Sequence, residues 1–503
     1  DKGTGVLMVC SYGDKYDAEA INRHKLKPKI ILNNDGTLNV NGYEKLKIKE
    51  ARKKILEDLK KRNLISEQKN ITHVVNVHDK CGTEIEILPT KQWFTKILDK
   101  KKILIEQGKK IKWHPDYMRK RYENWINGLE WDWNISRNRD FGIPIPVWEC
   151  KECGKLIVAE EKELPVDPSR IKKTCCGKPA IPEMKVFDTW QTSSISPEIA
   201  SELVSQKIKQ PYSVRCNAHD IIRTWDFYTI AKSWMHQKTI PWQNIMISGF
   251  VTLGGEKMSK SKGNVIAPQE ITSSHGADSL RYWAASCKLG EDSDFQEKEV
   301  VTGKKFVTKI WNASKFIFQG LKQVKETVKL EEIDRLFLTR LNNLIEKATA
   351  SFEDYEYARA KNLVIDFFWH DFCDNYLEIV KNRIYSGIKK ESAEYVLYSS
   401  LLAILKLMAP ITPFITEELY LKYFKNQERD SSIHISKWPE KIKVKSSKQD
   451  DEVWSSFIEI LTKVRHAKSK AQKSMKAEII LTIEKDKYKQ LGRWIEDLKA
   501  VTC

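Results

Sequence analysis

The sequence has no run of about 18 apolar residues, the length that a helix needs to cross a bilayer. Its ten cysteines are scattered along 503 residues, unlike the regular spacing of a disulfide-rich domain. It starts at Asp1, without an initiator methionine or the pattern of a signal peptide. We therefore expect a cytoplasmic protein with reduced thiols and no membrane partner, and we expect it to be a piece of a longer chain.

Positive charge and aromatic residues are both abundant. The chain carries 86 Lys and Arg residues against 68 Asp and Glu residues, which gives a net charge of +18. Such an excess favours a polyanionic partner. The 16 Trp, 17 Tyr and 17 Phe residues can fill several buried cores, and the length suits about three or four domains.

The spacing of apolar residues predicts an α/β region in the first 300 residues. An Asn-Asp-Gly sequence at 34–36, flanked by apolar residues, predicts a hairpin turn. Residues 45–62 have the spacing of an amphipathic helix. A core-facing helix at 220–235 precedes a buried strand at 245–251, which is the order of elements in a doubly wound α/β domain.

The second part of the chain has a different pattern. Strand signals become sparse after about residue 300, and long helical periods take their place. One helix is expected to end near Gly387, and another, at 394–408, is expected to stop before Pro410. This part is therefore predicted to be a helical bundle.

A lysine-rich loop carries the strongest chemical signal. Glycines at both ends, Gly254-Gly255 and Gly263, allow the segment to move. Lys257 and Lys260 can bring positive charge to a polyphosphate and stabilise the charge that develops as pyrophosphate leaves. In so basic a chain, however, a cluster of lysines alone is better explained as a solvated surface.

The residues of this loop resemble the nucleotide-binding signature of the class I aminoacyl-tRNA synthetases. The resemblance implies that five residues bind ATP, with the two lysines catalytic: Lys257, Met258, Ser259, Lys260 and Ser261. It implies a partial editing domain, the second half of a Rossmann-like catalytic domain and an anticodon-binding helical bundle. Further matching segments follow in family order and extend the resemblance over nearly the whole chain: 134–148, 188–194, 219–225, 278–283 and 409–414.

Two details resemble the valine-specific members of the family, of the archaeal or eukaryotic kind, more than the isoleucine-specific ones. Phe141-Gly142 stands where the isoleucine enzymes have Trp-Gly, and Asp188-Thr189-Trp190 replaces their Trp-Phe-Asp-Ser pattern. The resemblance therefore implies ATP-dependent activation of valine, with Mg²⁺, and its transfer to tRNA(Val) by a monomer. Isoleucine specificity stays open as an alternative.

The resemblance also implies two further sites. Asp220 and Trp225 match the segment that lines the aminoacyl-adenylate site, although a tryptophan on an apolar helix face is by default a core residue. Asp17 falls where the family has the carboxylate that holds the amino group of mischarged threonine, with Asp14 as a weaker candidate. Editing is needed because a hydrophobic pocket rejects an isostere with an added hydroxyl by only about 10².

Four cysteines suggest a structural zinc site on an insert in the catalytic domain. Cys150 and Cys153 have the C-x-x-C spacing of a zinc knuckle, and Cys175 and Cys176 follow. The second pair is adjacent, which departs from the usual spacing and should make simultaneous ligation harder. Bound Zn²⁺ and free structural thiols therefore both remain open.

The expected domain order combines these features. We expect an editing part, a catalytic domain interrupted by the zinc insert, a connecting segment, the bundle and a basic end, over the following ranges: 1–90 partial editing domain, 91–149 first retained part of the catalytic domain, 150–185 zinc-binding insert, 186–266 catalytic domain with the lysine loop, 267–322 connecting segment that contacts the tRNA stem, 323–445 anticodon-binding bundle and 446–503 basic C-terminal segment.

One element of the family is missing from the sequence. The His-x-Gly-His-type tetrad, whose imidazoles help to stabilise the transferring phosphate, does not occur in the 503 residues. We therefore expect a fragment that is inactive by itself in amino-acid activation. A tRNA-binding module without ligase activity is the alternative from a different class.

Overall fold

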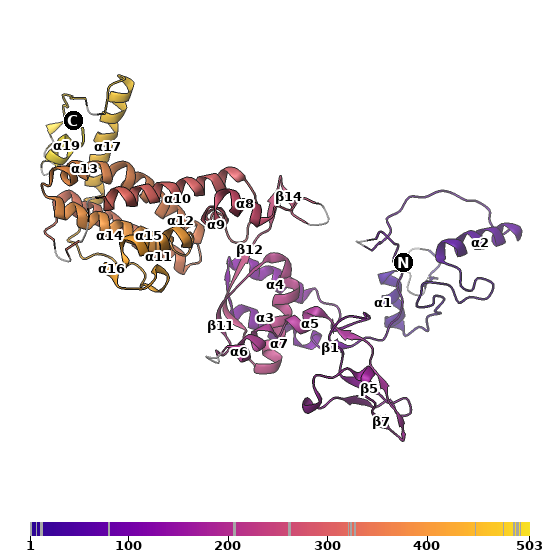
Figure 1. The fold of residues 1–503 in the computed structure, drawn as a ribbon. Coiled ribbons are helices and arrows are strands. Elements are labelled where there is room, and N and C mark those ends of the chain that lie inside the picture. The colour runs from indigo at the N-terminus through magenta and orange to yellow at the C-terminus, as the bar shows by residue number, and fades with distance from the viewer. Residues whose placement is uncertain are drawn as a thin grey trace. The chain divides into compact units, whose positions relative to one another are not determined.

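The computed structural model describes residues 3–6, 8–10, 14–78, 81–204, 208–259, 263–319, 321, 324–325, 328–447, 449–475, 477–485, 488, 492 and 494–502. The chain divides into two compact units (Figure 1). The first comprises residues 1–94 and 134–138, and the second comprises residues 95–133 and 139–503. None of the helices in the described ranges is both long and apolar enough to span a membrane.

The first unit contains two helices, α1 (Lys15–His24) and α2 (Ile48–Lys61). The predicted hairpin turn is confirmed, because the N–H of Asn33 donates to Thr37 O at 2.8 Å. The carboxylate of Asp35 accepts a hydrogen bond from the N–H of Thr37 at 3.0 Å, which is the usual role of aspartate in a tight turn. The amphipathic helix predicted at 45–62 is α2.

The centre of the second unit is a parallel sheet in the order β11-β12-β2. Residues Tyr122 and Phe227 of the neighbouring helices and Ile245 of the central strand are fully buried in its core. The helix predicted at 220–235 begins as a 3₁₀ turn, continues as a π turn over Ile222–Asp226 and ends as α7. The strands and helices are β2 (Lys112–His114), β11 (Tyr212–Ala218), β12 (Trp242–Ser248), α3 (Lys101–Lys110), α4 (Arg119–Asn127) and α7 (Phe227–Gln237).

Two small sheets extend this region. One forms the cysteine-containing insert and contains β5 (Val147–Glu149), β6 (Leu156–Val158) and β9 (Ile181–Pro182), next to the hairpin of β7 (Thr174–Cys175) and β8 (Lys178–Pro179). The other carries the lysine loop and contains β13 (Val251–Leu253), β14 (Glu256–Lys257) and β15 (Ser293–Asp294). The second unit also contains the short elements β10 (Val186–Phe187), α5 (Thr189–Ser193) and α6 (Ser196–Leu203). Strand β4 (Ser136–Arg137) belongs to the first unit, and β1 (Phe94–Thr95) and β3 (Trp133–Asn134) each span the boundary in the chain between the two units.

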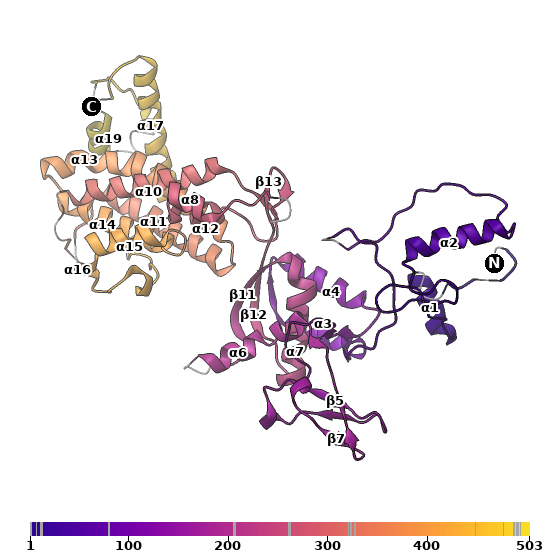
Figure 2. The same ribbon diagram turned by 45° about the vertical axis from the view of Figure 1, so that its right-hand side comes forward.

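The rest of the second unit is helical, as predicted. Helices α10, α11 and α14 lie side by side in both ribbon views (Figures 1 and 2). The chain leaves α13 at Gly387, whose φ of 77° allows the left-handed turn that ends the helix. The helices are α8 (Pro268–His275), α9 (Ala277–Ala284), α10 (Glu297–Phe318), α11 (Glu332–Glu353), α12 (Tyr357–Asp366), α13 (Leu377–Ser386), α14 (Lys390–Met408), α15 (Pro413–Tyr423), α16 (Lys425–Glu428), α17 (Asp450–Lys470) and α19 (Ile495–Thr502).

The basic segment expected at 446–503 contributes to the bundle core. Its helix α17 packs against α11 and buries Trp454, Phe457 and Leu461 almost completely. These residues recur at intervals of three and four, while most of the lysines lie on the exposed side of the segment. The lysine-rich composition of the segment does not reveal this apolar stripe.

Candidate functional site

The structure brings together two residues that the sequence connected with nucleotide chemistry. Asp220 lies on the 3₁₀ turn His219–Ile221, directly after β11, and Lys257 lies on β14. Their Oδ2 and Nζ atoms are 3.9 Å apart, and the two side chains are 45% and 53% exposed. The same ammonium group lies 3.6 Å from the ring centroid of Phe250. An exposed lysine held in this way is available to a phosphate that enters from solvent.

Glycines allow the chain to reach this position. After β12 the backbone passes so close to another segment that a Cβ at Gly249 would lie 2.1 Å from Glu291 O, which no side chain could tolerate. The hairpin between β13 and β14 turns at Gly254 and Gly255, whose φ angles are 61° and 81°. Two consecutive residues with positive φ are typical of the tight two-residue turn that joins the antiparallel strands of a β-hairpin.

Two aspartates next to or within β15 hold the lysine hairpin. Asp294 accepts hydrogen bonds from the Thr252 hydroxyl at 2.9 Å and from the N–H of Gly255 at 3.0 Å. Asp292 accepts the N–H of Phe250 at 2.7 Å. The backbone N–H of Phe250 lowers the pKa of Asp292, and the N–H of Gly255 lowers that of Asp294. Both carboxylates therefore stay charged and fix the hairpin on the parallel strand beside it.

His219 is fixed from both sides of its ring. Arg121 lies with its Nη1 3.1 Å from Nδ1 of His219, and Nε2 lies 3.2 Å from the Asp292 carboxylate. An arginine can only donate, so Nδ1 accepts and Nε2 carries the proton that faces the carboxylate. The ring also packs edge-on against Phe250 at 4.3 Å. Arg121 and Asp292 were not predicted from the sequence, because neither lies near the motif in the chain.

Asn264 closes the base of the lysine loop. Its Oδ1 accepts the N–H of Ser259 at 2.8 Å, and its Nδ2 donates to Lys257 O at 3.3 Å. The N–H of Met258 donates to Val251 O at 3.4 Å, which continues the hairpin. Lys260 and Ser261, the other two members of the predicted ATP-binding set, lie outside the described residues.

Trp225 lies in the core between the helices and the sheet. Its ring stacks on Trp242 with centroids 5.3 Å apart, and the guanidinium of Arg215 lies 4.0 Å from its centroid. Its indole N–H donates to Ser193 O at 3.1 Å, and the residue is only 8% exposed. These contacts give Trp225 a structural role, and a contact with substrate stays a prediction.

Asp17 lies in the first unit, in the first turn of α1. Its N–H donates to the carboxylate of Asp14 at 2.9 Å, so Asp14 is the N-cap of this helix. Capping explains Asp14 without any role in editing. The carboxylate of Asp17 is partly exposed, and its editing role stays a prediction.

The four cysteines of the insert form one cluster. All four Sγ atoms, from Cys150, Cys153, Cys175 and Cys176, lie within 4.8 Å of one another. The Cys153–Cys175 and Cys175–Cys176 Sγ distances are both 3.8 Å. The left-handed φ of 51° at Cys176 turns the chain between β7 and β8, so adjacency does not keep the two thiols apart. Hydrogen bonds from the N–H groups of the knuckle, first that of Cys153, lower the pKa of Cys150 to about 7.

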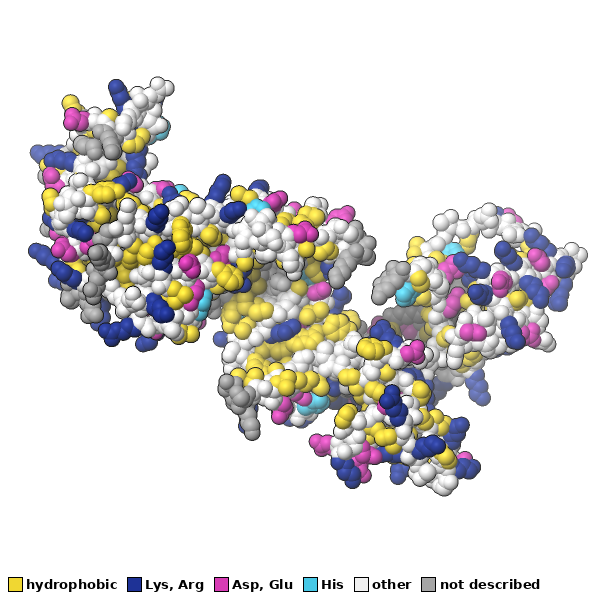
Figure 3. Space-filling view, viewed as in Figure 1, with side chains coloured by type: hydrophobic (Ala, Val, Ile, Leu, Met, Phe, Trp, Pro, Cys, Tyr) yellow, Lys and Arg dark blue, Asp and Glu magenta, His cyan; other side chains and the backbone are white. Residues whose placement is uncertain are grey.

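Basic side chains do not gather into a single patch on the face seen in Figure 3, where lysine and arginine are spread over each part of the chain. Arg281, for example, donates to Pro410 O at 2.8 Å and to Ile411 O at 3.0 Å. Lys309 lies 5.1 Å from the ring centroid of Trp369. The distribution of basic side chains therefore does not show where a polyanionic partner would bind.

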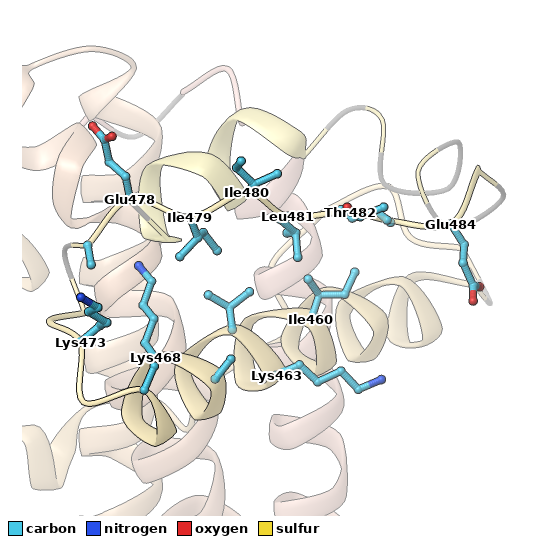
Figure 4. Close-up of a pocket in the computed structure, with 15 residues that line it drawn as sticks. Ile460, Lys463, Lys468, Lys473, Glu478, Ile479, Ile480, Leu481, Thr482 and Glu484 are labelled. Carbon is cyan, nitrogen blue, oxygen red and sulfur yellow. The ribbon is translucent and has the colours of Figure 1, made fainter.

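A separate cavity of about 710 Å³ lies between α17 and residues 477–484 (Figure 4). Its walls are mainly aliphatic, and Lys463, Lys468 and Lys473 stand at its edges. The ammonium of Lys468 donates to Met475 O at 2.8 Å. None of the predicted site residues lines this cavity.

Comparison with known families agrees with the geometry of the lysine hairpin. The family described as tRNA synthetases class I (I, L, M and V) matches residues 43–296, which include β11, the Asp220 turn and the hairpin. The chain belongs to the class I tRNA synthetases. A second family, described as the anticodon-binding domain of tRNA ligase, matches residues 334–484, which include most of the bundle and α17.

Curated relatives of this class I chain are named valine–tRNA ligases. One from Ehrlichia ruminantium (strain Welgevonden) is 42% identical over 528 aligned residues, covering 100% of this chain and 64% of the relative. Another, from Picrophilus torridus, is 40% identical, covering 96% of this chain and 63% of the relative. The chain thus spans slightly less than two thirds of the length of these relatives.

Solved structures of class I synthetases share the fold. A methionyl-tRNA synthetase from Mycobacterium tuberculosis, in complex with methionyl-adenylate, matches with a TM-score of 0.53 and 15% identity, covering 74% of this chain and 71% of that one. A LeuRS from Agrobacterium radiobacter K84, in a ternary complex with tRNA and LeuAMS, matches with a TM-score of 0.51 and 22% identity, covering 70% and 50%. The predicted fold class is confirmed by these matches.

Proposed function

We propose that this chain is part of a valine–tRNA ligase. The intact enzyme activates valine with ATP, releases pyrophosphate and transfers the valyl group to tRNA(Val). The observation that carries this proposal is the 42% identity to a valine–tRNA ligase over the whole chain. The relatives described above are all named for valine, which favours valine over isoleucine.

The geometry supports a role for Lys257 in phosphate chemistry. Its ammonium is exposed, adjacent to Asp220 and mounted on a hairpin that two aspartates and Asn264 hold in place. A preorganised positive charge at this position stabilises the charge that develops on the phosphates as pyrophosphate leaves. Lys260 is assigned the same role from the motif. ATP is a substrate here, and the Mg²⁺ that it carries supplies further positive charge to its phosphates.

Asp220 is proposed to line the aminoacyl-adenylate site together with the hairpin. The carboxylate is close enough to Lys257 to position the lysine before nucleotide arrives. Entry of ATP then offers the ammonium a more highly charged partner. The proposed contact of Trp225 with substrate has weaker support, because its ring is occupied by Trp242 and Arg215.

Editing and tRNA binding complete the proposed activity. Asp17 is proposed to hold the amino group of threonine on mischarged tRNA(Val), so that the ester can be hydrolysed. The match of residues 334–484 to an anticodon-binding domain supports tRNA as the polyanionic partner and a bundle that extends past residue 445. For the rest of the chain we keep the domain boundaries expected from the sequence. We also propose that the enzyme is cytoplasmic and monomeric.

Zn²⁺ is proposed as a structural ion in the insert. A tetrahedral zinc site with Zn–S bonds of about 2.3 Å has S···S edges of about 3.8 Å. The Cys153–Cys175 and Cys175–Cys176 Sγ distances have this length, all four Sγ atoms lie within 4.8 Å of one another, and four thiols form a donor set that zinc prefers. Cys150, Cys153, Cys175 and Cys176 would hold the ion, which would crosslink the knuckle after β5 to the β7–β8 hairpin.

Valine-dependent exchange of pyrophosphate into ATP, measured on the natural full-length protein, tests the proposal. Lys260→Ala should slow exchange by about 10² to 10³, the usual effect of losing one preorganised donor, and should leave tRNA binding nearly unchanged. Lys151→Ala, an exposed lysine on the insert, is the matched control. Exchange with isoleucine instead would assign isoleucine specificity. A protein that binds tRNA but exchanges with neither amino acid would be the binding module.

A further inference from the structure

A buried polar pair lies directly behind the Asp220 turn. Asp226, at the end of the π turn, is completely inaccessible to solvent. Asn217 is the next-to-last residue of β11. Its Nδ2 donates to Asp226 Oδ2 at 3.0 Å and to Ala218 O at 3.1 Å. The amide of Asn217 therefore connects the carboxyl group of Asp226 to the backbone that leads into the turn.

The pair lacks one donor. Asn217 Oδ1 and Asp226 Oδ1 are both buried, and neither has a hydrogen-bond partner within the described ranges. Both oxygens are acceptors while Asp226 is ionised, and two buried unsatisfied acceptors are costly. A protonated carboxyl group, in contrast, has one O–H donor and a carbonyl acceptor, and it can face the amide of Asn217 with one donor opposite an oxygen and one acceptor opposite an N–H. One proton on Asp226 would supply the donor that the two buried oxygens lack, beside the hydrogen bond that Asn217 already donates to Asp226.

The surroundings of Asp226 favour this proton. Three charged or titratable groups face it, namely Arg215 on β11, Asp220 on the 3₁₀ turn and Tyr122 on α4. Burial is the main cause that raises the pKa of Asp226 to about 7, and the charge of Asp220 adds to it. Hydrogen bonding by Asn217 and the charge of Arg215 act in the opposite direction. The guanidinium of Arg215 is stacked on Trp225 and forms no ion pair with Asp226 among the described contacts.

We propose that Asp226 carries a proton in the folded protein and forms a closed acid–amide pair with Asn217, which positions the end of β11 and thereby the turn that bears Asp220. Asp226 is then a positioning residue, since it acts through Asn217 and Ala218 O. Its effect on the reaction rests on the proposed role of Asp220 at the adenylate site. The pair itself does not depend on that role.

Replacement by asparagine gives a sharp test, because an amide mimics the protonated acid at every pH. Asp226→Asn keeps one donor and one acceptor facing Asn217, whereas Asp226→Ala removes both. In the unfolded chain Asp226 ionises near its ordinary pKa of 3.8. Wild-type folding therefore takes up a proton between about pH 4 and 7, so that stability falls as pH rises through this window. Asp226→Asn lacks this contribution.

The measurement is denaturant unfolding of this chain at pH 5, 6 and 7, followed by tryptophan fluorescence. The unfolding constant of the wild type, divided by that of Asp226→Asn, should rise by up to tenfold for each pH unit. Isotope-edited infrared spectra should contain the C=O band of a protonated aspartic acid at pH 6 that Asp226→Asn lacks. A constant ratio together with no such band would overturn the proposal.

A kinetic measurement on the full-length protein separates the pair from the function. Valine-dependent pyrophosphate exchange by Asp226→Asn should keep its rate above pH 7, where the wild type declines. Asp226→Ala should raise KM for ATP at least as much as it lowers kcat, because the Asp220 turn loses its support. If exchange with valine is absent altogether, the proposed function fails, while the unfolding ratio still decides on the pair. Identical pH profiles for Asp226→Asn and wild type would contradict the positioning role.

Discussion

The ammonium of Lys257 lies 3.9 Å from the carboxylate of Asp220, so the lysine hairpin and the turn after β11 form one site. Both side chains are about half exposed, and an ion pair of this kind contributes less than about 1 kcal/mol to stability. The lysine can therefore leave Asp220 for a phosphate at little cost. The pair is better suited to orienting Lys257 than to holding the fold together.

Removing the carboxylate of Asp220 should accordingly lower the activity without substantially lowering the stability of the fold. We expect Asp220→Asn to change the free energy of unfolding by less than about 1 kcal/mol and yet to lower the rate of pyrophosphate exchange in the full-length protein. Thermal unfolding and exchange kinetics check the two parts. Asp116→Asn, an exposed aspartate with one ion pair to Arg119, is the control. Parallel losses of stability and exchange would indicate a structural role for Asp220.

Asp278 on α9 caps a helix that lies far away in the sequence. Its carboxylate accepts the N–H groups of Phe414 at 3.2 Å and Ile415 at 2.6 Å, at the start of α15. Asp278→Ala leaves these two donors without their partner, at a cost of about 1 to 3 kcal/mol, and also removes a negative charge from a helix N-terminus. Thermal unfolding should show the loss. Glu270→Ala, on the neighbouring α8, should not, and equal midpoints for the two variants would contradict the capping role.

A buried ion pair holds α11 and α13 together. Arg383 Nη2 lies 2.7 Å from both carboxylate oxygens of Asp334, which also accepts the hydroxyl of Tyr376 at 2.6 Å. Asp334 is fully buried. Asp334→Ala would leave a buried guanidinium unpaired, so we expect a loss of about 3 to 5 kcal/mol in urea unfolding.

Changing both members of this pair distinguishes charge from packing. Asp334→Leu combined with Arg383→Met leaves no unpaired charge and should recover a large part of the loss. If the double variant is as unstable as Asp334→Ala, the loss comes from packing and not from an unpaired charge.

The ion pair between Arg335 and Asp450 gives a pH-dependent contribution in acid. Hydrogen bonds from Arg335, the nearer at 2.6 Å, lower the pKa of Asp450 to about 2 from an ordinary value of 3.8. The folded carboxylate thus binds its proton less readily than the unfolded one. The contribution is complete well above pH 4 and is lost as pH falls towards 2.

Asp450→Asn should therefore lose about 2 kcal/mol near neutral pH, and less as the pH approaches 2. Unfolding of the wild type and the variant between pH 2 and 6 measures this convergence. Asp451→Asn is the control. Asp451 is the exposed residue next to Asp450, and its carboxylate lies 3.5 Å from Arg340. If the free energies of unfolding of the wild type and Asp450→Asn differ by the same amount at every pH, the contribution of Asp450 to stability does not depend on its charge.

Local patterns predicted those parts of the structure whose causes are local. Apolar spacing gave α2, and Pro410 correctly marked the end of α14 at Met408. Spacing also picked out the four cysteines that the fold gathers. Composition was a poorer guide for α17, since its many lysines hide the stripe that contains Trp454 and Phe457.

The rest of the site depends on contacts between distant segments. Asp292 and Asp294 hold the lysine hairpin from a strand some forty residues later, and Arg121 reaches His219 from α4. Nothing in the local sequence distinguishes these residues from other charged side chains. Only the pairing of β13 with β15 and the packing of α4 bring them to the site.

The cysteine cluster has the dimensions of a zinc site, and metal analysis can test whether it holds the ion. We expect this chain, purified without chelators, to hold about one zinc ion, and Cys176→Ser to lower that ratio by removing one of four thiolates. Cys10→Ser changes an exposed cysteine of the other unit and is the matched control. Trp148 is buried beside the cluster on β5, and its indole N–H donates to Ile171 O at 2.8 Å. Removal of zinc should therefore change tryptophan fluorescence in the wild type and in Cys10→Ser. Wild-type protein free of zinc, with a fluorescence spectrum unaffected by added Zn²⁺, would show that the four thiols are structural by themselves.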